Sequence, residues 1–167
     1  MRLLFLLISY FFITNSYANN FTIEQVRELY QKSSKEEISC KKLIGSLQPY
    51  NENNNTSLAA YRACATMIMA KYVTGPINKL SKFNEGKKLL EKCIEKDNRN
   101  LEIRFLRFTV QSNAPKFLGY SSSMLLDKNF ILNALPSIND KQLKNIVISF
   151  LKSSTYLTNT EKQKLIS

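Results

Sequence analysis

The sequence contains no histidine and no tryptophan, and it has only four glycines, four prolines and three cysteines among 167 residues. Histidine is the side chain that most often binds zinc or acts as a general base near neutral pH. The cysteines, Cys40, Cys64 and Cys93, include no Cys-x-x-Cys pair. These absences disfavour zinc sites and Cys/His catalysis.

The sequence also gives little support for other kinds of catalytic site. The sequence has no glycine-rich phosphate-binding loop. The acids Glu91, Glu95 and Asp97 stand among lysines on one helical surface, which does not suit a carboxylate pair facing one cleft. The run 121–123 holds three serines, but without histidine a serine nucleophile would need a lysine base, and helix capping suits them better. We therefore predict no enzyme activity, no cofactor, no metal site and no catalytic residue.

Acidic residues are scarce: 13 stand against 24 lysines and arginines, for a net charge of +11. The lysines are scattered and form no continuous run, which is typical of a solvated basic surface. For an exported protein, such a charge favours contact with anionic glycans, phospholipid head groups or acidic proteins, and no nucleic acid partner is expected.

The N-terminus has the pattern of a secretory signal peptide. Met1-Arg2 is a short positive region, residues 3–13 are an apolar run, and Ser16 and Ala18 are small residues at the positions that determine cleavage. We expect a signal peptide over 1–18 and a single helical domain over 19–167, secreted or periplasmic, without a later transmembrane segment. In that compartment an odd number of cysteines leaves at least one unpaired or pairs it with another molecule. The alternatives are three buried small hydrophobic residues or one disulfide.

Apolar residues recur with the helical period throughout the rest of the chain, and no useful length of strand-like alternation is present. The sequence predicts an all-α fold with about seven helices. Capping boxes of Thr22 with Gln25, Ser34 with Glu37 and Thr158 with Glu161 predict three helix starts. Single caps predict further starts at Thr56 or Ser57, Ser122 or Ser123, and Asn139. The helix after Thr56 or Ser57 should end at about Tyr72, and its alanines allow a neighbour to approach closely. A further helix is expected over 84–96, whereas 77–83 is ambiguous.

The stretch 100–130 is the one around which the remaining elements are expected to pack. At 100° per residue, Leu101, Phe105 and Phe108 fall on one side of a helix that starts after Asn100. A second apolar group falls on the other side: Ile103, Leu106 and Val110. A helix that is apolar on two sides is normally buried between neighbours, so this one should be central.

A polar stripe separates the two apolar faces of that helix: Arg104, Arg107 and Gln111. Pro115 ends the helix, and Lys116 and Tyr120 in the following loop extend the stripe. The loop also has three large side chains around Gly119, which suggests that it folds onto the core: Phe117, Leu118 and Tyr120. Two guanidinium groups one turn apart can clasp a carboxylate or a phosphate of a partner. Alternatively, the arginines bond carbonyls of the loop 113–120, or pair with Glu102 or Asp127, and hold the structure together.

A weak internal repeat has a spacing of 47 residues. Ser39-x3-Leu43-x2-Ser46-x4-Asn51 recurs as Gly86-x3-Leu90-x2-Cys93-x4-Asn98. This pattern resembles the second helix of the tetratricopeptide repeat, and the resemblance covers about 23–110. Arg27 and Arg107 stand where that repeat has a small residue.

The resemblance implies stacked antiparallel helical hairpins that present a binding surface. The whole pattern also resembles that of small exported bacterial helical proteins of unassigned function. Our interpretation is an exported, non-enzymatic domain that binds a protein or peptide partner on a basic face. The candidate residues are Arg104, Arg107, Gln111, Lys116 and Tyr120. The alternative is a module that binds an anionic glycan or lipid surface at the cell envelope.

Overall fold

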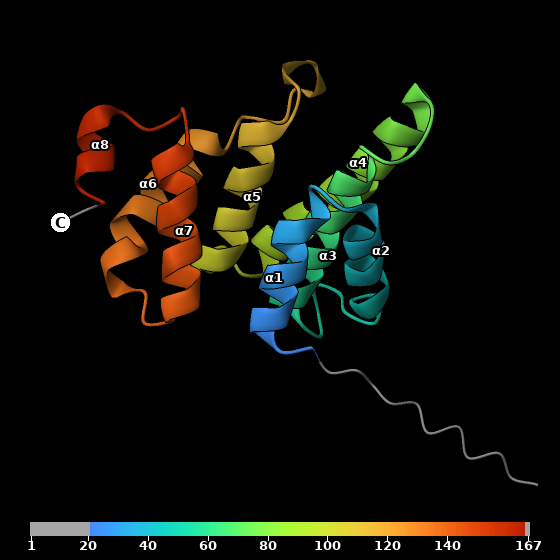
Figure 1. Cartoon of the computed structure of the whole chain (residues 1–167), viewed down its shortest axis with the longest axis horizontal. Coiled ribbons are helices and arrows are strands. Elements are labelled where there is room, and N and C mark those ends of the chain that lie inside the picture. Colours follow the sequence, from blue (N-terminus) through green and yellow to red (C-terminus); the bar gives the residue numbers. More distant parts are fainter. Residues whose placement is uncertain (1–20, 166–167) are drawn as a thin grey trace, which may run out of the picture.

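The computed structural model describes residues 21–165, and these residues form eight α-helices and two short 3-10 helices without a strand. The all-α prediction is confirmed. The expected signal peptide, residues 1–18, lies outside the described residues. The α-helices are α1 (Ile23–Ser33), α2 (Glu37–Ser46), α3 (Thr56–Met69), α4 (Pro76–Lys96), α5 (Leu101–Asn113), α6 (Met124–Ala134), α7 (Lys141–Ser153) and α8 (Asn159–Gln163) (Figure 1). The 3-10 helices are η1 (Lys116–Leu118) and η2 (Leu135–Ser137).

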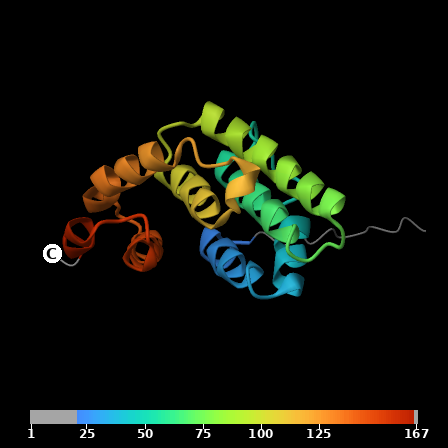
Figure 2. The ribbon, with the colours of Figure 1, turned by 90° about the horizontal axis from the view of Figure 1, so that it is seen from above.

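Helix α5 lies in the middle of an elongated molecule, with α1 to α4 on one side and α6 to α8 on the other (Figures 1 and 2). Its two apolar faces enter different cores, as the sequence predicts. Ile103 and Leu106 belong to the core shared with α1 to α4, whereas Phe105 and Phe108 belong to the core shared with α6 to α8. Both phenylalanines are buried, so α5 joins the two cores through its own side chains.

Neighbouring helices in the sequence pack against each other as the pairs α1 with α2, α3 with α4, and α5 with α6. The contact between α3 and α4 is especially close at Gly86. A Cβ atom at that position would lie 2.4 Å from the carbonyl oxygen of Ala63 and 2.7 Å from a side-chain carbon of Met67. Glycine at 86 and the alanines of α3 therefore permit the close approach that the sequence suggested for this region.

Two of the predicted helix starts agree in detail with the structure. Thr22 and Gln25 form a capping box at α1, and Thr158 and Glu161 form another at α8. Asn100 caps α5 by accepting a hydrogen bond from the N–H of Ile103. In each case the short polar side chain satisfies a backbone donor that the first helical turn leaves unpaired.

The predicted capping box of Ser34 and Glu37 is wrong. Ser34 is instead the C-cap of α1, which ends at Ser33, and the N–H groups of Lys35 and Glu36 both bond to the carbonyl of Lys32 in a tight turn. Helix α2 therefore begins two residues later than the box requires, after Glu36. The Ser34 hydroxyl donates to the carbonyl of Gln31 and does not cap α2.

Neighbouring residues replace the predicted caps at α3 and α7. Asn55 caps α3 in place of Thr56 or Ser57, and Asp140 caps α7 in place of Asn139. At α6, Ser123 occupies the cap position as predicted, but its side chain makes no capping hydrogen bond. All these residue types are suitable caps, so the exact start depends on how the chain enters the helix.

The ambiguous segment 77–83 is helical, and it forms one continuous helix with the predicted 84–96. Pro76 occupies the first turn of α4, where its missing N–H costs no hydrogen bond. Helix α3 ends at Met69, three residues before the predicted Tyr72, because Ala70 and Lys71 bond to carbonyls three residues back and tighten the last turn.

Cys40, Cys64 and Cys93 are all buried and form no disulfide with one another. The interpretation as small buried hydrophobic residues is thus confirmed. Burial raises the pKa of the Cys40 thiol to about 11 and that of Cys93 to about 12, and it also raises the pKa of Cys64. At neutral pH the three thiols are therefore protonated and poorly nucleophilic.

Candidate binding site

Arg107, the middle residue of the polar stripe of α5, is buried in a charged cluster. Its Nε lies 2.7 Å from one carboxylate oxygen of Asp127 on α6, and its Nη2 lies 2.9 Å from the other. Its Nη1 donates to Glu91 on α4 at 2.8 Å. Burial on its own lowers the pKa of Arg107, but the hydrogen bonds and charge of Asp127 and Glu91 outweigh that effect and raise it. All three guanidinium nitrogens are thus engaged.

Arg104 lies on the same side of α5 and bonds the same carboxylate. Its Nη1 donates to Asp127 at 2.9 Å, its Nε donates to the carbonyl of Asn98, and its guanidinium stacks over the ring of Phe130. Asp127 is fully buried and receives both arginines. The alternative in which the arginines pair with Asp127 is confirmed, whereas pairing with Glu102 is wrong.

Glu102 pairs instead with Arg27 on the opposite side of α5. The Nε and Nη2 atoms of Arg27 donate to the two carboxylate oxygens of Glu102 at 2.7 and 3.0 Å. Its Nη1 donates to Asp140 and Gln142 at the start of α7, at 2.8 and 2.9 Å. Tyr61 of α3 donates to Glu102 at 2.6 Å. Arg27 therefore ties α1 to α5 and α7.

The sequence reasoning missed the structural role of Arg27, although one signal was present. Arg27 stands next to Val26 on the apolar side of a short amphipathic helix, and arginine is almost never fully buried without a partner. Burial on its own lowers its pKa, but the hydrogen bond and charge of Glu102 raise it above the usual value. Arg27 and Arg107 are both buried ion-pair centres.

The loop after α5 returns to the core at two of its three large side chains, Leu118 and Tyr120. Gly119 adopts φ = 60°, a left-handed conformation that suits glycine, and Tyr120 then enters the core. The Tyr120 hydroxyl donates to Glu91, and burial together with this bond raises its pKa. Phe117, however, is 86% exposed. The expectation that all three large side chains fold onto the core is wrong for Phe117.

Gln111 lies one turn beyond Arg107 on α5 and differs from it in having no partner. The residue is only 3% exposed, and neither its amide nitrogen nor its amide oxygen has a hydrogen bond to another described residue. An unpaired polar group in a protein interior costs about 1–3 kcal/mol. A buried polar group without a partner suggests that a ligand or water satisfies it, and Gln111 lines a cavity that could hold one.

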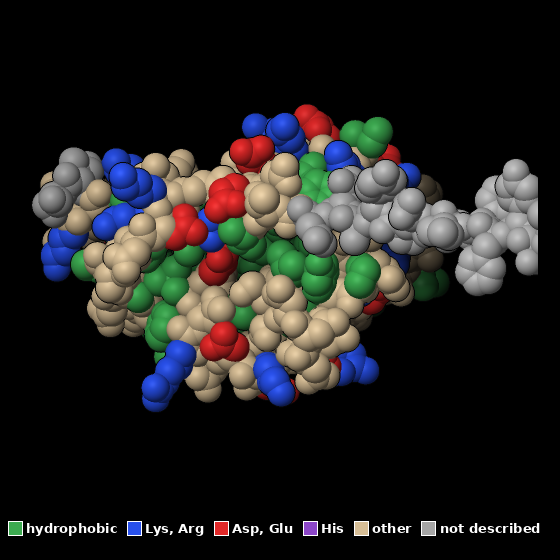
Figure 3. All heavy atoms as spheres, turned by 90° about the horizontal axis from the view of Figure 1, so that it is seen from below, with side chains coloured by type: hydrophobic (Ala, Val, Ile, Leu, Met, Phe, Trp, Pro, Cys, Tyr) green, Lys and Arg blue, Asp and Glu red, His purple; other side chains and the backbone are tan. Residues whose placement is uncertain are grey.

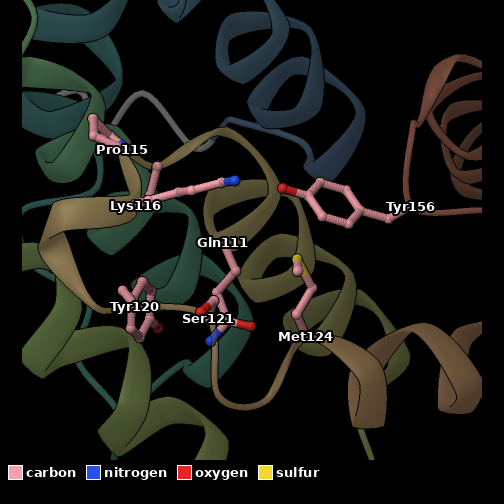
Figure 4. A pocket seen from close by; sticks show the side chains of 8 residues that line it. Gln111, Pro115, Lys116, Tyr120, Ser121, Met124 and Tyr156 are labelled. Carbon is pink, nitrogen blue, oxygen red and sulfur yellow. The ribbon is translucent and has the colours of Figure 1, made fainter.

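Gln111 lines a cavity of about 260 Å³ formed by the end of α5, the loop 114–121, the start of α6 and Tyr156. In Figure 4 the Lys116 amine and the Tyr156 hydroxyl point toward each other across this space, and the Gln111 amide lies near Ser121. Within residues 21–165, the side chains of Lys116, Ser121 and Tyr156 also have no hydrogen bond or ion pair. Four polar side chains without partners thus face one cavity.

The walls of the cavity are apolar and polar in similar measure. Ala114, Pro115, Met124 and the ring of Tyr120 contribute to them. No acidic side chain lines the cavity. Glu91, the acid that Tyr120 contacts, is bonded to Tyr120 and Arg107. Small-molecule and peptide sites also combine apolar wall surface with a few polar groups, although their walls are usually more apolar than this one.

The cavity brings Lys116 and Ser121 together, which raises the question of a serine nucleophile with a lysine base. No hydrogen bond joins the two, and the Lys116 amine points toward Tyr156 (Figure 4). Both residues are exposed. A lysine that acts as a base is normally desolvated, so this arrangement suits binding of a charged group better than catalysis.

The structure brings Gln111, Lys116 and Tyr120 of the predicted site together and places Arg104 and Arg107 apart from the cavity, in the cluster around Asp127. Ser121, Met124 and Tyr156 are additional lining residues that the sequence reasoning did not assign to this site. Tyr156 could not have been found by local spacing, because it comes from the segment between α7 and α8.

A larger hollow of about 330 Å³ is a weaker candidate. It is lined by Glu52, Lys92, Glu95 and Lys96, and Lys92 pairs with Glu52 at 3.2 Å. All four of its lining residues are charged, and the apolar part of its wall comes from their aliphatic stems. Within residues 21–165, no group of three or more cysteine, aspartate or glutamate side chains is arranged to hold a metal ion. In the same range, none of the helices has the length and apolar sequence that crossing a membrane requires.

Comparison with known proteins gives no relative: no family model matches the sequence, and neither the curated proteins nor the solved structures include a match. The resemblance to the tetratricopeptide repeat stays a prediction. The functional argument therefore depends on the geometry of the cavity.

Proposed function

We propose that this chain is an exported, non-enzymatic helical domain that binds a protein or peptide partner, and that it binds this partner at the Gln111 cavity. The observation that carries the proposal is the buried Gln111 amide, whose donor and acceptor are both unpaired, in a residue that lines the cavity. A partner that supplies one acceptor and one donor would remove the cost of burying that amide.

The position of the charges supports binding of an acidic partner at this cavity. Lys116 carries a positive charge with no neutralising acid among the described residues, and no carboxylate lines the space. Arg104 and Arg107, in contrast, are already neutralised by Asp127 and Glu91. We therefore assign the basic character of the binding face to Lys116 and assign the two arginines to support of α5 and α6.

Binding can be tested with the folded chain and a pool of short acidic peptides, followed by changes in backbone amide NMR signals. We expect the largest changes within 111–124 and at Tyr156, and we expect Lys116→Ala to weaken binding. Lys79→Ala is the matched control, because Lys79 is also an exposed lysine but lies on α4. Equal weakening by both variants would show non-specific attraction to positive charge, and no change in the signals would contradict the proposal.

A second candidate function, binding to an anionic lipid or glycan surface, is favoured by a different observation. Phe117 in η1 is 86% exposed and Ile77 near the start of α4 is 82% exposed. The loop after α5 and the N-terminal end of α4 project toward the same side of the molecule (Figure 1). Lys116 adjoins Phe117 in the sequence.

On another face, the Lys and Arg side chains lie mainly near the outline and form no continuous basic area (Figure 3). We therefore place the surface-binding candidate at the two projecting ends. The protein should sediment together with vesicles of anionic phospholipid, and the bound fraction should fall steeply as the salt concentration rises. Phe117→Ser should reduce this bound fraction, whereas a bound fraction that does not depend on salt would contradict the candidate.

A further inference from the structure

Building on the proposed function, we infer that the cavity takes an extended peptide segment that carries a carboxylate, with Gln111 bound to the peptide main chain. The N–H and the C=O of one residue in an extended chain point to the same side, as in the hydrogen-bonded pairs of an antiparallel sheet. A glutamine side chain offers one acceptor and an NH2 donor side by side. One Gln111 side chain can therefore bond both groups of one peptide residue.

The burial of Gln111 makes this main-chain bond selective for a peptide that fits the space. The residue is 3% exposed, and it lies on α5 between Arg107 and the helix end, where packing on both faces holds the helix. Both amide atoms are themselves buried, so a ligand in the cavity can bond to them only when the side chain turns toward that space.

The groups at the mouth of the cavity define the second half of the ligand. The Lys116 amine and the Tyr156 hydroxyl point toward each other, and neither has a partner in the described chain (Figure 4). A carboxylate between them would accept a charge-assisted hydrogen bond from the amine and a second bond from the hydroxyl. The carboxylate of an acidic side chain and the carboxylate of a chain end offer the same chemistry.

The size of the cavity limits the ligand to a narrow segment. Its volume of about 260 Å³ lies slightly below the range of about 300–1,000 Å³ that is usual for small-molecule sites. Pro115 and Met124 provide apolar contact for one small side chain, and the exposed Phe117 offers a further apolar surface next to Lys116. The competing occupant is water, which can also satisfy a buried amide.

Three N-acetylated probe peptides separate these possibilities: Ala-Asp-Ala with an amidated end, Ala-Ala-Ala with a free carboxyl end, and Ala-Asn-Ala with an amidated end. A fourth probe is the first peptide with N-methyl groups on its internal amides. The side-chain amide signal of Gln111 in the nitrogen-labelled full chain is identified by its loss in Gln111→Met. Titration then gives the affinity of each probe at this group.

We expect at least one carboxylate probe to shift the Gln111 amide signal, and the stronger of the two identifies the source of the carboxylate. Replacing Asp by Asn in the amidated peptide, or N-methylating its main chain, should weaken binding by about tenfold each if the acidic side chain is the source. If the chain end is the source, amidation of Ala-Ala-Ala is expected to have that effect. Gln111→Met should weaken binding in either case, and Lys79→Ala should not.

The possible failures are distinct. This inference is overturned if probes with and without a carboxylate bind equally well. It is also overturned if N-methylation does not weaken binding of the probe. In both cases peptide binding at the cavity stands. If no peptide shifts the Gln111 amide and its signal shows contact with water, both the inference and the proposed function are overturned, and Gln111 is a hydrated buried group only.

Discussion

Arg107 and Gln111 lie one turn apart on α5, and both are buried, but their surroundings are opposite. Arg107 has every guanidinium nitrogen bonded to a carboxylate of α4 or α6. Gln111 has no bond at either end of its amide and adjoins a cavity. The charged residue, which looks more functional in the sequence, is structural, and the neutral residue beside it marks the candidate site.

The difference follows from the cost of burial. An uncompensated charge inside a protein is far more costly than an unpaired amide, so a folded chain must supply partners for a buried arginine. An unpaired amide costs about 1–3 kcal/mol, which a protein can tolerate when a ligand later satisfies it. Substitutions at Arg107 and Gln111 compare these two costs directly, and substitutions at Asp140 and Lys116 measure how solvent exposure reduces the cost.

The largest expected effect is that of Arg107→Ala. Removing the arginine leaves Asp127, which is fully buried, with a single remaining arginine, so we expect a loss of about 3–5 kcal/mol in the free energy of unfolding. Urea unfolding followed by circular dichroism measures this loss. Arg99→Ala on the exposed surface is the control. A loss below about 1 kcal/mol would show that the Arg107 cluster is not structural.

Gln111→Met is expected to raise the free energy of unfolding, because methionine has a similar side-chain volume and removes the unpaired amide. Unfolding measured in the same way should show a gain of about 1–3 kcal/mol, together with the loss of peptide binding. Gln31→Met, at an exposed position of α1, should change the stability by less than about 0.5 kcal/mol. A clear loss of stability in Gln111→Met would mean that the amide has partners in the free protein.

A smaller effect is expected at Asp140, which caps α7 and also pairs with Arg27 but is largely exposed to solvent. The backbone hydrogen bond from Leu143, followed by the bond and charge of Arg27, lowers its pKa below the usual value of 3.8. A carboxyl group with a lowered pKa stabilises the fold above its unfolded pKa, and this contribution is lost as the pH falls through the folded value.

Asp140→Asn keeps a good helix cap and removes the charge. The variant should therefore be less stable than the parent at pH 7, and the difference should shrink as the pH falls below 3.8. Thermal unfolding at a series of pH values checks this trend. A difference that is constant between pH 7 and the acid range would show that the charge of Asp140 does not contribute.

The smallest effect on stability is expected for Lys116→Ala. Lys116 is exposed and has no ion pair in the described chain, so the free energy of unfolding should change by less than about 0.5 kcal/mol. Peptide titration of the same variant should nevertheless show weaker binding. A substantial loss of stability in Lys116→Ala would indicate that Lys116 supports the loop and not a ligand.

The sequence predicted those features that depend on local spacing. The two apolar faces of α5 follow from the helical period, and the structure assigns each face to its own core. The capping boxes at Thr22 and Thr158 follow from residue types three positions apart. The box at Ser34 failed because a tight turn of the backbone used the same residues.

The candidate site was only partly predictable. Gln111, Lys116 and Tyr120 could be chosen because they continue one stripe into one loop. Tyr156 and the partners of Arg27 come from distant parts of the chain, and Asp140 is 113 residues from Arg27. Asp127, which is 20 residues from Arg107, was one of two acids that the sequence suggested as partners, and only the fold selects it over Glu102. No local pattern contains that choice.

The sequence alone thus determined an all-helical chain and a central helix apolar on two sides, because helix formation and amphipathicity depend on residues within one or two turns. Only the tertiary structure decided which polar residues of that helix are paired. Pairing depends on which carboxylates the other helices bring within hydrogen-bond distance, and that is a property of packing and not of spacing along the chain. Packing neutralises Arg107 and leaves Gln111 facing a cavity.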